Sequence, residues 1–370
     1  MADLYIGLMS GTSLDGVDAV LVDFDGERPQ VISHGAQAFS AELKAELLAL
    51  NSSGADELHR AALASNALVS AYAQQVNAIL AQSGVSAKSI KAVGAHGQTV
   101  RHRPQEFDGT GYTLQLNQPS LLAELCGIDV VADFRSRDVA AGGQGAPLVP
   151  PFHRAFFGKV DQTVCVINIG GISNISILDP QSNDLVGYDC GPGNALIDTW
   201  CLAHTGKPYD DAGQWAAKGK VNATLLARMQ QEPYFAKPAP KSTGRDLFNQ
   251  AWLDAQLAAN AGLKPITVQA TLTELTAWAC ANSVRASSPG CTSLVVCGGG
   301  ALNRELMRRI QAALPDCTVE SSEIWGLPPL QVEATAFAWL ARQTVNRQTS
   351  SLPSVTGASG ARILGAIYPA

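Results

Sequence analysis

Several hallmarks of common protein classes are missing from this chain of 370 residues. It has no run of Lys and Arg and its formal net charge is −6, which argues against non-specific binding of nucleic acid. Its apolar stretches have the length of strands and fall far short of the ~20 residues of a membrane-spanning helix, so we expect no membrane contact. The start of the chain lacks a basic segment and a long apolar core, so we expect no secretory signal.

The cysteine pattern excludes two further classes. The eight cysteines include no C-x-x-C pair, so neither a zinc ribbon nor a redox pair is indicated. Cys165, Cys280 and Cys297 lie in apolar runs, which predicts buried thiols in a reducing compartment. With 46% hydrophobic and 16% charged residues, the chain is typical of a globular protein of roughly two domains. We therefore expect a cytoplasmic protein.

The familiar phosphate-binding loops are absent as well. The sequence contains no G-x-x-x-x-G-K-[ST], and no G-x-G-x-x-G opens a helix after a strand. A bound nucleotide would need another geometry. Glycine-rich hairpin turns offer one, because their backbone amides can form a concavity that binds anions.

The order of the apolar segments predicts a duplicated α/β fold. In the first half we expect strands and helices at 5–9, 17–24, 30–39, 56–82, 92–95, 120–126 and 128–132. In the second half we expect strands or helices at 164–168, 172–178, 185–188, 294–297, 302–314 and 318–320, with a helix after Pro192. Two successive β-β-β-α-β-α-β units predict two domains, 1–145 and 146–370, with a cleft between them. The Gly- and Pro-rich stretch 142–151 would connect them.

The turn between the first two expected strands is rich in small polar residues. Gly11 and Gly16 let the chain bend, and the Ser and Thr hydroxyls between them suit a phosphate. Asp15 and Asp18 would repel bare phosphate, which suggests a metal ion or its waters between the two. An ordinary hairpin with polar turn residues is the alternative.

Two glycine-bearing segments of the second half carry further signals. Asp189 is expected at the end of a strand, before a helix N-terminus, where a carboxylate can act as a general base; a helix cap is the alternative. The glycines 298–300 follow a buried strand and precede Asn303. Either an adenine ring packs on this backbone or a strand and a helix cross there closely.

Polar residues also follow apolar strands of the first half. The stretches 95–104 and 132–153 place His, Gln, Arg and Asp at expected strand ends. Such mixed donors and acceptors suit a polyhydroxylated substrate, and Arg suits a carboxylate or phosphate. A solvated loop is the alternative. Weaker signals come from 241–249 and from Glu333, which opens a helix after two prolines.

Taken together, seven motifs in this order resemble the anhydro-N-acetylmuramic acid kinase family: SGTSLDGVDAVLVDF, AHGQT, DFRSRDVAAGGQGAPLVP, NIGGISN, DCGPGNALID, STGRDLFN and CGGGALNREL. The resemblance covers nearly the whole chain. It implies the fold of the actin/hexokinase/heat-shock-chaperone ATPase superfamily, a ribonuclease H-like, actin-like two-domain architecture with a central ATP and substrate cleft. It also implies ATP and Mg²⁺ as cofactors. The implied reaction converts 1,6-anhydro-N-acetylmuramic acid into N-acetylmuramic acid 6-phosphate and ADP in cell-wall recycling.

The resemblance further assigns roles to residues. Asp189 matches the base that activates water; Cys190 follows it where Thr is frequent in the family, which leaves the base in place. The implied ATP-binding residues are Gly11, Thr12, Ser13, Leu14, Asp15, Gly16, Val17, Asp18, Gly170, Gly171, Asn174, Gly298, Gly299 and Asn303. The expected sugar contacts are His96, Gln98, Arg137 and Glu333, while the metal ligands stay open. A homodimer is expected from the resemblance alone.

Two other functions agree with parts of the sequence. A kinase for an ordinary sugar or a carboxylate would share the fold, but we would not expect it to combine the stretch 132–153 with Asp189. An ATP-gated clamp of the chaperone type would carry a peptide-binding appendage, which we do not expect here. We therefore favour the anhydro-sugar kinase.

Overall fold

The chain forms two compact units. The computed structural model describes residues 2–11, 14–26, 28–182, 185–239, 241–244, 247–258 and 262–370. The first unit is Met1–Phe156 with Gln331–Ala370, and the second is Phe157–Leu330. This division differs from the boundary expected at 145/146, because residues 146–156 and the C-terminal segment join the first unit.

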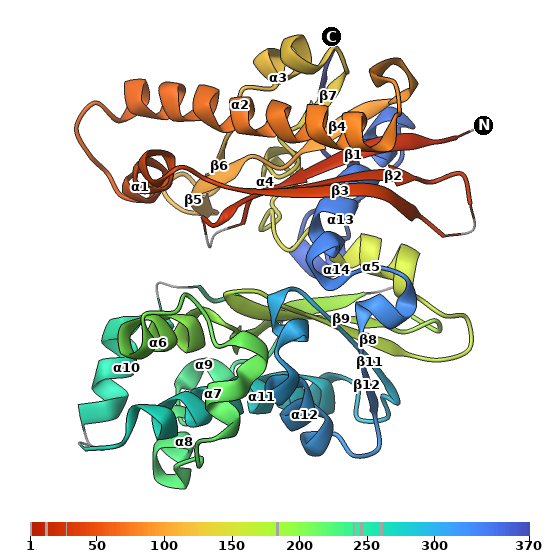
Figure 1. Ribbon diagram of the computed structural model, residues 1–370. Coiled ribbons are helices and arrows are strands. Elements are labelled where there is room, and N and C mark those ends of the chain that lie inside the picture. Colours follow the sequence, from red (N-terminus) through yellow and green to blue (C-terminus); the bar gives the residue numbers. More distant parts are fainter. Residues whose placement is uncertain are drawn as a thin grey trace. The chain divides into compact units, whose positions relative to one another are not determined.

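A six-stranded sheet forms the centre of the first unit, in the order β13-β7-β4-β1-β2-β3 (Figure 1). Its strands are β1 (Leu4–Met9), β2 (Gly16–Asp23), β3 (Gln30–Ala38), β4 (Ala92–Ala95), β7 (Val130–Ala132) and β13 (Ala366–Tyr368). Strands β1, β2 and β3 form an antiparallel meander, whereas β4 lies parallel to β1 and β7 parallel to β4. The strands expected from the sequence are thus present, with β13 added at the edge.

Helices cover both faces of this sheet. On one face, α2 (Glu57–Ser83) and α3 (Pro119–Cys126) close a core with β1, β2 and β4; on the other lies α13 (Val332–Val345) (Figure 1). The remaining elements are α1 (Ala41–Ala49), η1 (Ala87–Ser89), α4 (Ser136–Ala140), α5 (Pro150–Phe157), α14 (Pro353–Thr356) and the two-stranded sheet of β5 (Gln98–Pro104) and β6 (Gly111–Leu116). The sequence did not predict α1, β5 or β6.

Two glycines explain why α13 belongs to the first unit. A Cβ on Gly7 in β1 would lie 1.8 Å from the Ala334 carbonyl oxygen, and one on Gly94 in β4 would lie 2.1 Å from that of Phe337. The helix backbone therefore touches the strand backbones directly, at a distance that only glycine permits. Glu333, in the first turn of α13, is carried into the first unit by this packing.

The second unit repeats the strand order of the first. Its sheet has the order β10-β9-β8-β11-β12 (Figure 1). The strands are β8 (Val164–Ile169), β9 (Ile172–Leu178), β10 (Val186–Pro192), β11 (Ser293–Cys297) and β12 (Thr318–Ser321). Again the first three strands form an antiparallel meander, and the last two run parallel to the first. The duplicated α/β fold predicted from the sequence is confirmed.

Helices of the second unit form two cores. One lies between the sheet, α11 (Pro265–Ser287) and α12 (Arg304–Ala313), and the other lies among α6 (Ala195–Thr205), α8 (Ala223–Met229), α10 (Gln250–Leu257) and α11. The short elements are η2 (Asp211–Gly213), α7 (Gln214–Ala217), α9 (Pro233–Ala236), η4 (Gly299–Leu302), η5 (Ser322–Trp325) and η6 (Pro329–Gln331). All eight cysteines are buried and none forms a disulfide.

Within the residues that the structure describes, no helix is both long and apolar enough to traverse a bilayer.

Candidate active site

The turn between β1 and β2 presents its backbone in an unusual conformation. The Leu14 amide donates to the Gly11 carbonyl at 3.2 Å, and Leu14 has φ +58°, in the left-handed region that a leucine rarely adopts. Such backbone outliers gather at ligand-binding turns. Thr12 and Ser13, both predicted to bind phosphate, lie outside the described residues.

Buried side chains support this turn from below. Ser10, 1% exposed, donates to the Gly97 carbonyl at 3.1 Å and lies 2.8 Å from the Tyr72 hydroxyl. Gln98, fully buried, donates its side-chain amide to the Gly11 carbonyl at 3.1 Å. Gln98 was expected to contact a sugar, whereas the structure places its amide against the hairpin.

The two carboxylates of the hairpin differ in environment. Asp15 is exposed and forms an ion pair with Lys44 at 3.3 Å. Asp18, on β2, is half-buried, and this burial, together with the charge of Asp15, raises its pKa to about 6. Within the described ranges no three His, Cys, Asp or Glu side chains form a metal-binding group.

The hairpin turn between β8 and β9 in the second unit is in direct contact with the residues that precede α6. The amides of Gly193 and Asn194 donate to the carbonyls of Gly171 and Gly170 at 2.9 and 2.8 Å. A Cβ on Gly193 would lie 2.3 Å from the Gly170 oxygen. The start of α6 thus packs directly on this turn and fixes the position of the segment that follows Asp189.

Asp189 lies at an irregularity of the sheet. It sits inside β10, immediately before a shift in register, and not at the strand end expected from the sequence. The N-cap of α6 is Asn194, so Asp189 does not cap that helix. The alternative of a capping role is therefore excluded.

Backbone groups hold the Asp189 carboxylate in place. Its Oδ2 accepts from the Thr243 amide at 3.0 Å, and its own amide donates to the Lys241 carbonyl at 3.2 Å. The Tyr234 hydroxyl donates to the Asp189 carbonyl at 2.7 Å. Burial raises the pKa of this carboxyl to about 6, and the Thr243 hydrogen bond opposes part of that rise. Such a group is ionised at neutral pH and still basic enough to accept a proton.

A row of polar side chains crosses the sheet beside Asp189. In the antiparallel ladders, Asp189 lies directly opposite Asn174, and Asn174 lies opposite Asn168. Opposed residues direct their side chains to the same face of a sheet. Asn174, predicted to bind ATP, therefore shares a face with the candidate base.

Protein contacts account for two of the three consecutive glycines. A Cβ on Gly298 would lie 2.3 Å from Asn168 Oδ1, and one on Gly300 would lie 2.4 Å from the Ile169 side chain. At Gly299 the nearest atom is Asn194 Nδ2, at an ordinary 3.5 Å. The close crossing thus explains Gly298 and Gly300 and leaves Gly299 without a packing reason. Asn303 caps α12, accepting from the Leu306 amide at 3.0 Å.

A third cluster of predicted residues lies in the first unit, around Arg135. The guanidinium of Arg135 donates to His96 Nε2, at 2.8 Å from Nη2, and to the Gly145 carbonyl at 2.7 Å. Burial and the Arg135 charge lower the pKa of His96 to about 3, so the imidazole is neutral. Burial lowers the pKa of Arg135 to about 10, although the nearby carboxylates of Glu333 and Asp138 oppose the shift.

The sequence analysis proposed Arg137 as a sugar contact and did not single out Arg135, two residues earlier. Arg137 is exposed on α4, whereas Arg135 joins the predicted residues His96 and Glu333 in one electrostatic cluster. Asp138 completes the support by accepting from the Gly145 amide at 2.8 Å and from the Thr356 hydroxyl at 2.8 Å. The density of charged residues in the stretch 132–153 was the available signal, but it could not separate an inward from an outward Arg.

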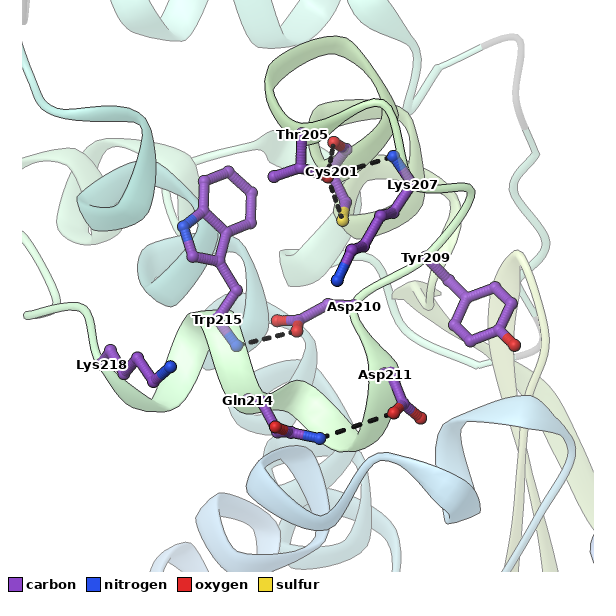
Figure 2. A pocket seen from close by; sticks show the side chains of 9 residues that line it. All are labelled: Cys201, Thr205, Lys207, Tyr209, Asp210, Asp211, Gln214, Trp215 and Lys218. Atoms are coloured by element: carbon purple, nitrogen blue, oxygen red, sulfur yellow. Dashed lines mark hydrogen bonds between the residues drawn. The ribbon is translucent and has the colours of Figure 1, made fainter.

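A pocket of about 320 Å³ opens in the second unit near the start of α12 (Figure 2). Asp210 turns its carboxylate to the Trp215 amide at 2.8 Å, and Gln214 points toward Asp211 (Figure 2). Gly213 lies between the lining residues Asp211 and Gln214, and a Cβ on it would lie 2.1 Å from Asn303 Oδ1. The pocket therefore lies beside the helix that follows the three glycines.

The predicted residues form two groups, one in each unit. The hairpin, Gln98, His96 and Glu333 lie in the first unit, while the candidate base Asp189 lies in the second. The other predicted residues of the second unit are Gly170, Gly171, Asn174, Gly298, Gly299 and Asn303. Two sheets of the same strand order, each with a glycine-bearing hairpin between its first two strands, define the actin-like ATPase fold.

Comparison with known proteins narrows this class to one family. The family model described as anhydro-N-acetylmuramic acid kinase matches residues 3–370. A protein of that name from Albidiferax ferrireducens is 60% identical, with all of both chains covered, and one from Variovorax paradoxus is 61% identical over 100% of this chain and 99% of the relative. The chain belongs to the anhydro-N-acetylmuramic acid kinase family and is a phosphotransferase.

Solved structures show more distant likeness. The activator of 2-hydroxyisocaproyl-CoA dehydratase from Clostridium difficile, with bound ADPNP, gives a TM-score of 0.49 at 12% identity, covering 93% of this chain and 96% of that chain. A ROK family glucokinase from Streptomyces griseus, in complex with glucose and AMPPNP, gives 0.43 at 16% identity, covering 92% and 99%. Likeness at this level supports no conclusion about activity.

Proposed function

We propose that the protein opens the anhydro bridge of 1,6-anhydro-N-acetylmuramic acid with water and transfers the γ-phosphoryl group of ATP to the released 6-oxygen. The products are N-acetylmuramic acid 6-phosphate and ADP. The reaction serves the recycling of cell-wall sugars in the cytoplasm. The support is the family membership of the whole chain together with the half-buried carboxylate of Asp189, which accepts a hydrogen bond from the Thr243 amide.

Asp189 acts as the general base in this proposal. It accepts a proton from the water whose oxygen bonds to the anomeric carbon, while the bond from that carbon to the 6-oxygen breaks. The anomeric carbon develops positive charge in such a step, so a carboxylate nearby also stabilises the transition state. The pKa of about 6 keeps Asp189 ionised at neutral pH and able to take the proton.

The hairpin of the first unit binds the phosphates of ATP. Turn amides stabilise the charge that spreads over a transferred phosphoryl group. Gln98 fixes the Gly11 carbonyl, so the amides of the turn keep their orientation. Asp18 fits Mg²⁺ because it is a shielded carboxylate beside this turn. Mg²⁺ would neutralise phosphate charge there.

The second unit supplies the nucleoside end of the ATP site. Gly299 lacks a packing partner that would explain a glycine, which leaves its backbone open to a flat ring. The same unit holds the pocket lined by Asp210, Asp211 and Gln214, near Asn303. The sugar contacts the cluster of Arg135, His96 and Glu333, together with Arg137. The protein forms a homodimer.

The test is ADP release from the purified protein with ATP, Mg²⁺ and one of three sugars. We expect turnover with 1,6-anhydro-N-acetylmuramic acid and none with N-acetylmuramic acid or glucose. Turnover with an open sugar alone would show a kinase that performs no ring opening. Absence of turnover with all three sugars would contradict the proposal as a whole.

A further inference from the structure

A second pocket of the second unit is lined in part by Lys241, whose carbonyl accepts the amide of Asp189. Its volume is about 390 Å³, and its wall is formed by the segment around Lys237 and Lys241 and by the α11 residues Asn282 and Ser287. A water molecule occupies about 30 Å³ in the liquid, so the pocket has room for a ligand of several heavy atoms. Nothing in the proposed reaction uses this pocket.

The charge in this pocket is uncompensated. Lys237 and Lys241 line it, and among the described residues no Asp or Glu does. The ammonium of Lys241 donates to the carbonyls of Tyr234 and Phe235 at 3.4 and 3.2 Å and lies 4.9 Å above the Tyr234 ring. Burial and the charge of Lys237 lower the pKa of Lys241. The Lys241 ammonium thus contacts two carbonyl dipoles and one ring face, and none of these partners carries a negative charge.

Neutral donors face the same space. Asn282 is half-buried and carries a side-chain amide, and Ser287, one turn or so further along α11, has its hydroxyl 2.6 Å from that of Tyr188. Two ammonium groups with an amide and hydroxyls match the acceptor oxygens of a phosphate or a carboxylate. A cation or an apolar ligand would leave these donors unsatisfied.

We propose that this pocket is a second binding site of the protein, which takes a small oxyanion: a phosphate or a carboxylate group. Lys237 and Lys241 supply the charge, and Asn282 and Ser287 supply hydrogen bonds. The site borders the catalytic segment, because the Lys241 carbonyl accepts the amide of Asp189. The proposal goes beyond the kinase reaction and does not depend on it.

The test is isothermal titration of the full chain with inorganic phosphate and, separately, with D-lactate. ADP and Mg²⁺ are present at saturation so that the nucleotide site is filled. We compare the wild type with Lys237→Gln and with Lys220→Gln, whose exposed lysine lines neither of the two pockets. Loss of one charged hydrogen bond predicts affinity about tenfold weaker in Lys237→Gln, with Lys220→Gln unchanged. Because Lys237 is exposed, the variant keeps its fold, which circular dichroism checks.

Each result has a defined meaning. Saturable binding of phosphate alone, lactate alone or both supports the site and identifies which anion it takes, provided that Lys237→Gln weakens it. A third variant, Ser287→Ala, should also weaken binding, since it removes a donor on α11. Absence of saturable binding by either anion, or equal binding by the wild type and Lys237→Gln, would overturn the proposal. Turnover with the anhydro sugar is measured separately, so failure of this site leaves the kinase proposal intact.

Discussion

The backbone amide of Thr243 donates to Asp189 Oδ2 at 3.0 Å, which joins a loop to a strand of the second unit. This hydrogen bond favours the ionised carboxylate, whereas burial disfavours it, and burial has the larger effect. The balance places the pKa of Asp189 at about 6, close to neutral pH. The first two predictions follow from this pair.

Turnover is expected to need Asp189 in its ionised form. A base works only when deprotonated, so kcat/KM should fall about tenfold per pH unit below a midpoint near pH 6 and level off above it. The measurement is the pH dependence of kcat/KM for the anhydro sugar at saturating ATP. An acid limb centred near pH 4, the range of an ordinary exposed Asp, would contradict the buried-base account.

Asp189→Asn should abolish turnover and leave ATP affinity within about twofold, because it removes the proton acceptor and keeps an oxygen for the Thr243 amide. The folded-state pKa is raised above 3.8, so the ionised group costs folding free energy, and this cost grows as the pH rises from 3.8 to about 6 and is complete above that. The variant should therefore have a higher Tm than wild type at pH 8 and an equal Tm at pH 4. Unchanged turnover would remove Asp189 from the mechanism.

Asp18→Asn should raise the Mg²⁺ concentration needed for half-maximal turnover, because the shielded carboxylate would no longer attract the cation or its waters. Asp15→Asn is the matched control, since Asp15 is exposed and paired with Lys44. Titration of Mg²⁺ at fixed ATP measures the difference. If both variants show the wild-type Mg²⁺ dependence, Asp18 has no part in cation binding.

Gln98→Ala distinguishes a hairpin support from a sugar contact. Loss of the donor to the Gly11 carbonyl should raise KM for ATP about tenfold and leave KM for the sugar within about twofold. The exposed Gln74→Ala on α2 serves as the control. The reverse pattern, a raised KM for the sugar alone, would show that Gln98 contacts the sugar as first expected.

The duplicated sheet could be predicted because its signals are local. Strands Ala92–Ala95 and Ile172–Leu178 match the sequence expectation residue for residue. The first is a short apolar run, the second mixes isoleucines with small polar residues, and polar or glycine residues bound both. Strand β5 was missed because Arg101 and Arg103 interrupt the apolar pattern. Strand β6 contains no charged residue and pairs only with β5, outside the two main sheets. The packing of α13 on Gly7 and Gly94 joins segments more than 200 residues apart, and no local pattern reveals it.

For the site residues, too, a local motif could be recognised in the sequence, whereas placement by distant packing could not. Asp189 could be proposed as a base from the sequence because its motif is local and its neighbours are distinctive. The sequence could not show which of Arg135 and Arg137 points inward. The direction of Arg135, at the N-cap of the short helix α4, depends on its contacts with His96 and Gly145. Gly298 and Gly300 likewise pack closely on strand β8, and this contact could not be predicted because β8 is distant in sequence.

The central claim is that water attacks the sugar and not the phosphate. The most direct measurement runs one turnover of 1,6-anhydro-N-acetylmuramic acid and ATP in ¹⁸O-water, quenches it rapidly and locates the label by mass spectrometry. A blank with N-acetylmuramic acid 6-phosphate corrects for exchange at the anomeric carbon. The account predicts ¹⁸O on the anomeric carbon and an unlabelled phosphoryl group on the 6-oxygen. Label in the phosphoryl group or in inorganic phosphate, with none on the sugar carbon, would contradict it.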